Sequence, residues 1–179
     1  MAMSSEEPPR PAPGSEIVAE AMNLEQDSGN REWGHKLASD FWMKVHLGLG
    51  LPSIALAAIA GTSALAEFDN SNLIAGLLAL AVAVLSALAT WLNPNRTAEL
   101  HRRASARYHS ICRRARQLHR IDPYAGRSLD DLRLTLYELA AEFDEQVASS
   151  PALPRRYTAV HEEVTAADVA RRGLFIPPG

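Results

Sequence analysis

The chain has 179 residues, a formal net charge of −3 and a single cysteine, Cys112. One cysteine excludes a disulfide within the chain and a zinc site built from several cysteines, and a slightly acidic chain without interleaved arginine and aromatic residues is not expected to bind nucleic acid. The overall composition is an average of two apolar runs and a polar remainder, which is large enough for one compact cytoplasmic domain.

The N-terminal third is expected to hold a tail and two helices. Residues 1–14 carry four prolines and predict a disordered tail. Residues 15–46 predict N-terminal cytoplasmic helices, separated by a break and cap at the DSGN of residues 27–30. The first helix is amphipathic and the second has apolar residues at intervals of four. Their stripes are Ile17, Val18, Ala21 and Leu24, and then Trp33, Leu37, Phe41 and Val45.

Two runs of 20 residues lack any charge, Leu47–Ala66 and Leu73–Leu92. A helix of this length is about 30 Å long, which matches the hydrocarbon core of a bilayer. The runs therefore predict transmembrane helices at 47–66 and 73–92, joined by a tight turn at 67–72. Pro52, helped by Gly48 and Gly50, predicts a kink near the entry of the first span.

The charges around the runs predict the orientation. The turn carries Glu67 and Asp69 and no basic residue, whereas Lys and Arg flank the other ends of both runs. Basic residues near span ends tend to stay in the cytoplasm. We therefore expect a multi-pass protein of the inner (plasma) membrane, with both termini cytoplasmic and an external turn. The flanking basic residues are Arg31, Lys36, Lys44, Arg96, Arg102, Arg103 and Arg107.

Residues 93–150 predict a cytoplasmic antiparallel helical hairpin. Asn93 is expected to cap the first helix, with Pro94 in its first turn, and Pro123 is expected to end it. Ser128, followed by Asp131, predicts the cap of the second helix, which ends near the SSPALP of residues 149–154. Residues 151–179 form a C-terminal tail with a short helix. The two core stripes are Ala104, Tyr108, Ile111, Ala115 and Leu118, and then Leu129, Leu132, Leu136, Leu139 and Phe143.

The hairpin has an uneven charge distribution. Residues 93–120 contain eight Arg and only one acid, Glu99, whereas residues 121–150 contain seven acids, Arg127 and Arg133. Three interpretations stay open: the helices pair by charge, the arginines bind anionic lipid headgroups, or they bind a phosphorylated ligand. The membrane-proximal basic residues are Arg96, Arg102, Arg103, Arg107, Arg113 and Arg114.

The sequence contains no recognisable catalytic motif. His101, His109 and His119 are spaced by eight and ten residues, which does not place two metal ligands on one helix face, so they are expected to be solvated or near lipid headgroups. We expect no enzymatic activity, catalytic residue, metal or cofactor.

Small residues form a face on each predicted span. Such faces let membrane helices approach closely, so the face on the second span is a candidate oligomer seam. No charge lies within either span, and any pore would be mostly apolar. The seam residues are Ala75, Ala79, Ala83 and Ala87; the face on span one is Gly50, Ala57, Gly61 and Ala64; the polar groups available to a pore wall are Ser53, Thr62, Ser63, Ser86 and Thr90.

Over about residues 30–155 the chain resembles the SLATT family of bacterial two-transmembrane effector domains. The resemblance lies in two close spans, the Asn-Pro after them, Ala98 and His101 in AELH, Ala104 and Tyr108 in ASARYHSI, and the later leucine-rich helix. It implies an all-α membrane protein that perturbs membranes or forms pores in antiphage conflict systems, activated by a separate nucleotide-synthesising or nucleotide-sensing protein. The expected function is an oligomeric effector of this kind; the alternative is a non-conducting anchor or scaffold that recruits a cytoplasmic partner.

Overall fold

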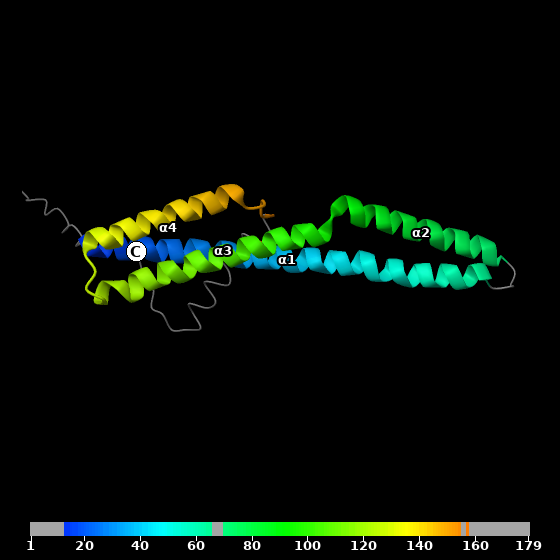
Figure 1. Ribbon diagram of the computed structural model, residues 1–179, viewed down its shortest axis with the longest axis horizontal. Helices are drawn as coiled ribbons and strands as arrows, with labels where there is room; N and C mark the ends of the chain where they lie inside the picture. Colours follow the sequence, from blue (N-terminus) through cyan, green and yellow to red (C-terminus); the bar gives the residue numbers. More distant parts are fainter. Residues whose placement is uncertain (1–12, 66–69, 155–156, 158–179) are drawn as a thin grey trace, which may run out of the picture.

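The computed structural model describes residues 13–65, 70–154 and 157, and every regular element among them is helical (Figure 1). The all-α class is therefore confirmed. The predicted tail up to residue 12, residues 66–69 at the predicted turn and the predicted C-terminal helix lie outside the described residues. The elements are α1 (Pro13–Leu65), α2 (Ser71–Leu92), α3 (Pro94–Arg120), the 3-10 helix η1 (Asp122–Tyr124) and α4 (Leu129–Ser149).

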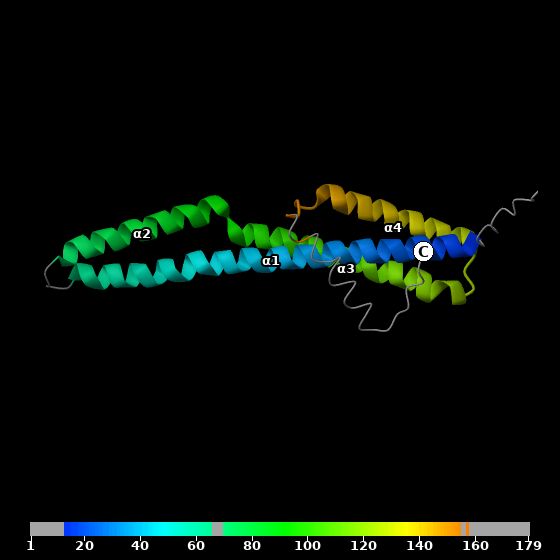
Figure 2. The same ribbon diagram turned by 180° about the vertical axis from the view of Figure 1, so that it is seen from behind.

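Helix α1 runs the whole length of the molecule (Figure 1). Its 53 residues correspond to about 80 Å at 1.5 Å per residue. Helix α2 lies beside the C-terminal part of α1, and α3 and α4 lie beside its N-terminal part, as the view from behind also shows (Figure 2). The molecule therefore has an apolar two-helix part and a three-helix part that share one continuous helix.

The predicted break at residues 27–30 is wrong, because α1 continues through it. The buried positions of α1 recur at intervals of three and four, and polar residues occupy two of them. Ser28 is fully buried, and its Oγ donates to the carbonyl of Leu24 at 2.6 Å. Packing against α3 and α4 thus outweighs the poor helix propensity of Gly29 and Asn30. The buried positions in the N-terminal half of α1 are Ile17, Ala21, Leu24, Ser28, Gly34, His35 and Ala38.

The predicted apolar stripe of the second N-terminal helix is only partly correct. Trp33 and Phe41 are exposed, with 39% and 37% of their surface accessible, whereas Leu37 and Val45 are half-buried. The inward face instead passes through Gly34, His35 and Ala38. A regular four-residue spacing of large residues therefore predicted the helix correctly but not the side that it buries.

Pro52 lies inside α1 without interrupting it. Proline has no N–H to donate to the carbonyl four residues earlier, that of Gly48. The neighbouring Ser53 Oγ donates to the carbonyl of Leu49 at 2.7 Å, which adds a hydrogen bond in the turn that proline weakens. A Cβ added at Gly48 or Gly50 would meet nothing within 4 Å, so neither glycine is required by packing within the chain.

Helices α2 and α3 meet at Asn93. Its backbone is in the left-handed region, with φ of 43°, a conformation that asparagine tolerates better than most residues. Asn93 is the N-cap residue and Pro94 begins α3, both as predicted, but the Asn93 side chain makes no capping hydrogen bond. This one residue offsets α3 from α2, as Figure 1 shows.

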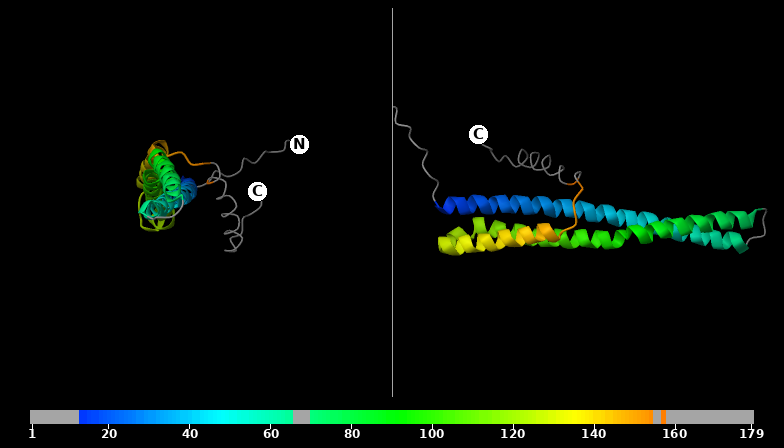
Figure 3. Two further views of the ribbon diagram at one scale, coloured as in Figure 1. Left: turned by 90° about the vertical axis from the view of Figure 1, so that its right-hand side faces the viewer. Right: turned by 90° about the horizontal axis from the view of Figure 1, so that it is seen from above.

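The three-helix part has a continuous core at the end away from α2, and Figure 3 shows from above how α4 and α3 lie alongside the N-terminal part of α1. Helix α3 ends at Arg120 just before η1, which contains Pro123, and the Ser128 Oγ accepts from the Asp131 N–H at 3.1 Å, as predicted. Leu129 was wrongly placed in the core: 47% of it is exposed. The core residues are Ile17, Ala21, Leu24, Ile111, Ala115, Leu118, Leu132, Leu136 and Leu139, with Phe143 packed against them.

Candidate functional site

The apolar parts of α1 and α2 expose almost all of their surface. Both are long and apolar enough to cross a membrane, and within their most apolar windows only 6% and 0% of the residues are buried by the rest of the chain. A core helix of a soluble protein would be mostly covered, because exposed apolar patches of this size are rare on soluble monomers. Leu51, Ile54 and Leu80, for example, are 63%, 70% and 62% exposed.

The two apolar helices contact each other along one face each. On α2 the half-buried face includes Leu78, Val82 and Leu85. Of the four candidate seam alanines, only Ala75 is half-buried, whereas Ala79, Ala83 and Ala87 are exposed. The contact between α1 and α2 therefore leaves most of the alanine stripe uncovered.

The small face on α1 is also largely uncovered. Ala57, Gly61 and Ala64 are exposed, and Gly50 is half-buried. A Cβ added at Gly61 would meet nothing within 4 Å. Within the described residues, most of each small-residue face is therefore free of helix–helix contact.

The hydroxyl groups of the apolar helices mostly bond to their own backbone. Thr62 Oγ1 donates to the carbonyls of Ala58 and Ile59, and Thr90 Oγ1 donates to that of Ser86 at 2.8 Å. Ser63 and Ser71 are buried, whereas Ser86 is exposed. Among these groups, Thr62, Ser86 and Thr90 lie on exposed surface.

A buried polar cluster lies between α1 and α3, in the half of the bundle that is nearer α2. The Nδ1 atoms of His35 and His101 are 2.9 Å apart, so one ring donates its N–H and the other accepts. His35 also stacks on Tyr108, with ring centroids 5.4 Å apart. Next to the pair, the Ser39 Oγ donates to the carbonyl of Ala98 at 3.0 Å. The expectation that His101 is solvated is wrong: it is buried.

Burial keeps both rings of this pair neutral. It lowers the pKa of His35 to about 4, with further contributions from the nearby His101 and the Arg31 cation, and it also lowers the pKa of His101. The hydroxyl of Tyr108 is buried without a hydrogen-bond partner. The cluster thus places polar groups inside the core. The two neutral histidines bond to each other, but the Tyr108 hydroxyl stays without a partner among the described residues.

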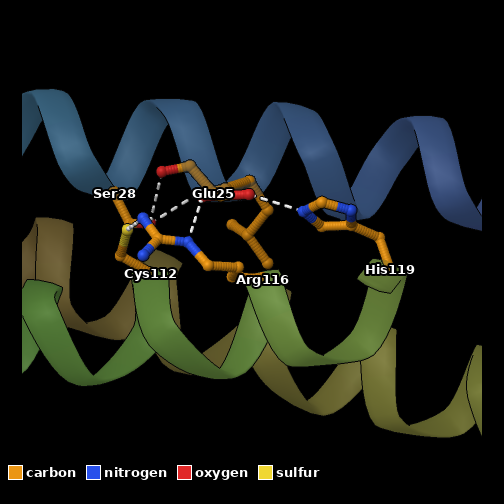
Figure 4. Close-up of polar contacts among 6 residues, drawn as sticks. Glu25, Ser28, Cys112, Arg116 and His119 are labelled. Atoms are coloured by element: carbon orange, nitrogen blue, oxygen red, sulfur yellow. Dashed lines mark hydrogen bonds and ion pairs between the residues drawn. The ribbon is translucent and has the colours of Figure 1, made fainter. Parts of the chain in front are cut away.

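A second polar cluster lies farther along the same helices, at Glu25 of α1 (Figure 4). Glu25 lies between Arg116 and His119 of α3: Oε1 accepts from the Arg116 Nε at 2.5 Å, and Oε2 lies 2.5 Å from the His119 Nε2. Burial alone would raise the pKa of Glu25, but the hydrogen bonds from His119 and Arg116 outweigh it and the pKa is lowered. The carboxylate therefore fixes the register of α1 against α3.

Cys112 lies beside this cluster, near Ser28 and Arg116 (Figure 4). The thiol is buried, and burial is the largest influence that raises its pKa. A raised pKa disfavours the reactive thiolate form. Within the part of the chain that the structure describes, no group of three or more His, Cys, Asp or Glu side chains could hold a metal ion.

The arginines of α3 are distributed over several partners. Arg102 and Arg103 bind Glu99 within the helix, and Arg114 pairs with Glu142 of α4. Arg107 donates to the amide oxygen of Gln146 at 3.2 Å. Within the described residues, Arg96 and Arg113 have no ion-pair partner. Among the described residues, charge pairing between α3 and α4 is therefore limited to the pair Arg114–Glu142.

Sequence reasoning missed the residues of α1 that α3 recognises. Glu25 and Glu32 bind His119 and His109 of α3, and His35 binds His101. The signal was available in the spacing, because positions 17, 21, 24 and 28 alternate steps of four and three residues, and positions 35 and 38 continue the pattern after half-buried position 31. Polar residues at two of these positions concealed it.

Comparisons with known proteins give no relative. No family model matches the chain, and no curated protein or solved structure matches it. The resemblance to the SLATT family therefore stays a prediction from the sequence pattern.

Proposed function

We propose that this protein is an oligomeric two-span membrane effector, with α1 and α2 inserted as a transmembrane hairpin and the three-helix bundle on the cytoplasmic side. The single observation that carries the proposal is the uncovered alanine stripe on α2, at Ala79, Ala83 and Ala87. In lipid, helix association depends on close packing of small residues, so an uncovered small face is suited to a second copy of the chain.

The exposed apolar surface supports insertion. A helix of 22 residues such as α2 is about 33 Å long, which is enough to cross a hydrocarbon core. Trp42 and Trp91 lie near the two cytoplasmic ends of the apolar segments, where interfacial aromatics are favoured. Arg96 follows in α3, is exposed and has no ion-pair partner among the described residues, so it is available to anionic headgroups on that side.

The continuity of α1 supports a role for the bundle in controlling the spans. One helix carries both His35 of the bundle and the first apolar segment, and no break separates them. A rearrangement of the bundle would therefore turn or shift the first span directly. We propose that assembly opens the membrane, and the resemblance to SLATT effectors favours an antiphage role with a separate nucleotide-linked activator.

The test is a pair of matched alanine variants expressed in bacteria. Replacing Ala79 and Ala83 with Leu keeps α2 apolar but fills the uncovered face, so we expect normal insertion, smaller crosslinked species and loss of dye leakage. Ala89 is half-buried on the α1-facing side. Ala89→Leu should instead disturb the hairpin and lower the amount of inserted protein.

The outcome separates the two candidate functions. Parent protein that assembles but never permeabilises cells or liposomes would favour the anchor or scaffold. A double Leu variant that assembles and leaks like the parent would refute the seam.

Orientation is tested by single cysteines in a Cys112→Ser background. Asn72 begins the external side of α2 and Ala106 lies on α3, and both are exposed. An impermeant maleimide added to intact cells should label Asn72→Cys and not Ala106→Cys. The reverse pattern would overturn the predicted orientation.

A further inference from the structure

A cleft of about 460 Å³ lies between α1 and the C-terminal end of α4. Asp27, Asn30, Arg31 and His35 line it from α1, and Phe143 lines it from α4. Its volume falls within the range of pockets that hold small molecules. The cleft shares His35 with the buried histidine pair, so it lies directly beside the contact between α1 and α3.

One wall of the cleft is the segment that follows α4. Ser150, Pro151, Ala152 and Leu153 line it. The segment is held close to α1 at Gly34, where an added Cβ would come within 3.0 Å of the Leu153 Cδ1. Glycine at this position lets the segment pack closely against α1, and the cleft therefore has two helical walls and one non-helical wall.

Arg31 supplies a cation that no side chain neutralises. Its Cζ lies 5.5 Å from the centroid of the Phe143 ring, and within the described residues it has no carboxylate partner. A guanidinium whose face rests on a ring keeps its N–H edge for an acceptor, and planar carboxylates match that edge. The chemistry of this position selects an anionic group.

Asn30 and Asp27 favour a hydrogen-bond donor on the ligand, whereas Arg31 favours an anion. The Asn30 Oδ1 is buried and has no hydrogen-bond partner. A buried amide oxygen without a partner gains a hydrogen bond from any N–H donor that reaches it from the cleft. Asp27 lines the same cleft and, among the described residues, has no ion-pair partner. Both oxygens select an N–H donor.

The remaining surface favours an apolar body. Phe143, Val147 and Leu153 line the cleft beside the polar groups. A ligand that fills it therefore needs an anionic group, an N–H donor and a flat or apolar part between them. Taken together, the geometry points to a binding site, and we propose that the cleft binds a small planar anion that carries an N–H donor.

Binding would affect the contact that joins the bundle to the spans. His35 lines the cleft and bonds to His101 of α3, next to the Ser39–Ala98 contact. A ligand on Arg31 and Asn30 stabilises one arrangement of α1 against α4 and, through His35, against α3. The regulatory consequence rests on the proposed function, whereas the binding site itself does not.

The test uses the full chain in lipid nanodiscs and equilibrium dialysis against the three aminobenzoate isomers. These isomers hold a carboxylate and an amine at different separations on one flat ring. Benzoate lacks the donor and aniline lacks the anion. We expect at least one aminobenzoate isomer to bind about tenfold or more tightly than benzoate and than aniline. Each reference compound lacks one charge-assisted hydrogen bond, and its loss costs about this much affinity.

Variants assign the two ends of the ligand. Arg31→Gln should weaken the aminobenzoate and benzoate alike, by about tenfold. The double variant Asp27→Asn and Asn30→Ala should remove the preference for the aminobenzoate over benzoate. Arg113→Gln, which removes an exposed arginine of α3 away from the cleft, should bind like the parent.

Two results would overturn the site. The first is that every isomer binds no more tightly than benzoate and aniline to the parent protein, a comparison that needs no variant. The second is unchanged binding by a folded Arg31→Gln protein. Dye leakage is measured separately, so an intact site in a protein that never permeabilises membranes would refute the proposed function and leave the site standing.

Discussion

The two halves of α1 follow the same spacing but have opposite surfaces. From Ile17 to Ala38 the helix buries one stripe against α3 and α4 and carries charges elsewhere. From Leu47 to Leu65 the inward positions are only half-buried, apart from Ser63. The outer ones carry no charge and are mostly leucine, isoleucine and alanine. The helix is thus amphipathic in its first half and apolar all round in its second. Under the proposed function, this difference corresponds to a change of surroundings along one helix, from water to lipid.

Stabilisation should differ between the halves accordingly. In the bundle, apolar side chains are removed from water on folding, which is the main favourable contribution to stability. In lipid there is no such driving force between helices, and packing dominates. The largest expected difference is therefore between shortening one side chain in the bundle and shortening one in the apolar two-helix part.

Leu139→Ala should destabilise the protein by about 3 kcal/mol, because Leu139 is fully buried in the core and its removal leaves a cavity. Leu80→Ala in α2 should change stability by less than about 1 kcal/mol, since Leu80 is 62% exposed within the chain. Equilibrium unfolding of the full chain in detergent, followed by circular dichroism, measures both.

Equal effects of the two truncations would contradict the comparison. A large effect of Leu80→Ala that disappears when the protein is diluted to monomers would instead place Leu80 in an interface between copies. Leu134→Ala is a matched control within the bundle, because Leu134 is 60% exposed on α4 and should behave like an ordinary surface position.

The next largest effect concerns pH. The pKa of His35 is lowered to about 4 from an ordinary value of 6.5, so between these values the unfolded chain binds more protons than the folded one. Stability therefore rises with pH across this window and is lost on acidification, by up to about 3 kcal/mol between neutral pH and pH 4. His35→Gln should lose correspondingly less stability on acidification.

The exposed His109 provides the control for this pH dependence. His109→Gln removes an exposed imidazole ring outside the core, so this variant should lose as much stability on acidification as the parent. If His35→Gln and the parent lose the same stability between neutral pH and pH 4, the burial of the histidine pair does not control acid stability.

Much of the architecture follows from patterns that local physics determines. The absence of charge over 20 residues, the Asn-Pro after the second run and the Ser128 cap each act within a few residues. These features predicted α2, the start of α3 and the start of α4. The α1 break was predicted wrongly for the opposite reason. Gly29 and Asn30 have poor local propensity, and packing against α3, which is distant in the sequence, overrides it; a Cβ added at Gly29 would lie 3.7 Å from the Cys112 Sγ.

The buried polar clusters could not be predicted because they depend on pairing between helices. His101 on an arginine-rich helix gives no local sign of burial, and its partner His35 is 66 residues away. Glu25 is likewise separated from Arg116 by 91 residues. The lopsided charge of the two later helices suggested that they pair with each other. The structure instead divides the pairs of α3 between α4 and α1.

The smallest expected effect tests this division. Glu25→Gln should destabilise the protein by about 2 kcal/mol, because it weakens two hydrogen bonds to charged or chargeable partners, Arg116 and His119. The Glu25 side chain is only 17% exposed and that of His119 only 7%, so little solvent replaces the lost interaction. Glu142→Gln removes the partner of Arg114, but both side chains are nearly half exposed, and the loss should stay below about 1 kcal/mol.

Salt distinguishes the two contacts further. High salt should abolish the small effect of Glu142→Gln, since exposed pairs are screened, and should leave most of the Glu25→Gln effect. Both are measured by equilibrium unfolding at low and high salt. If Glu142→Gln costs as much as Glu25→Gln, then α4 rather than α1 is the main electrostatic partner of α3. Signals from α4 would then reach α3 without passing through α1.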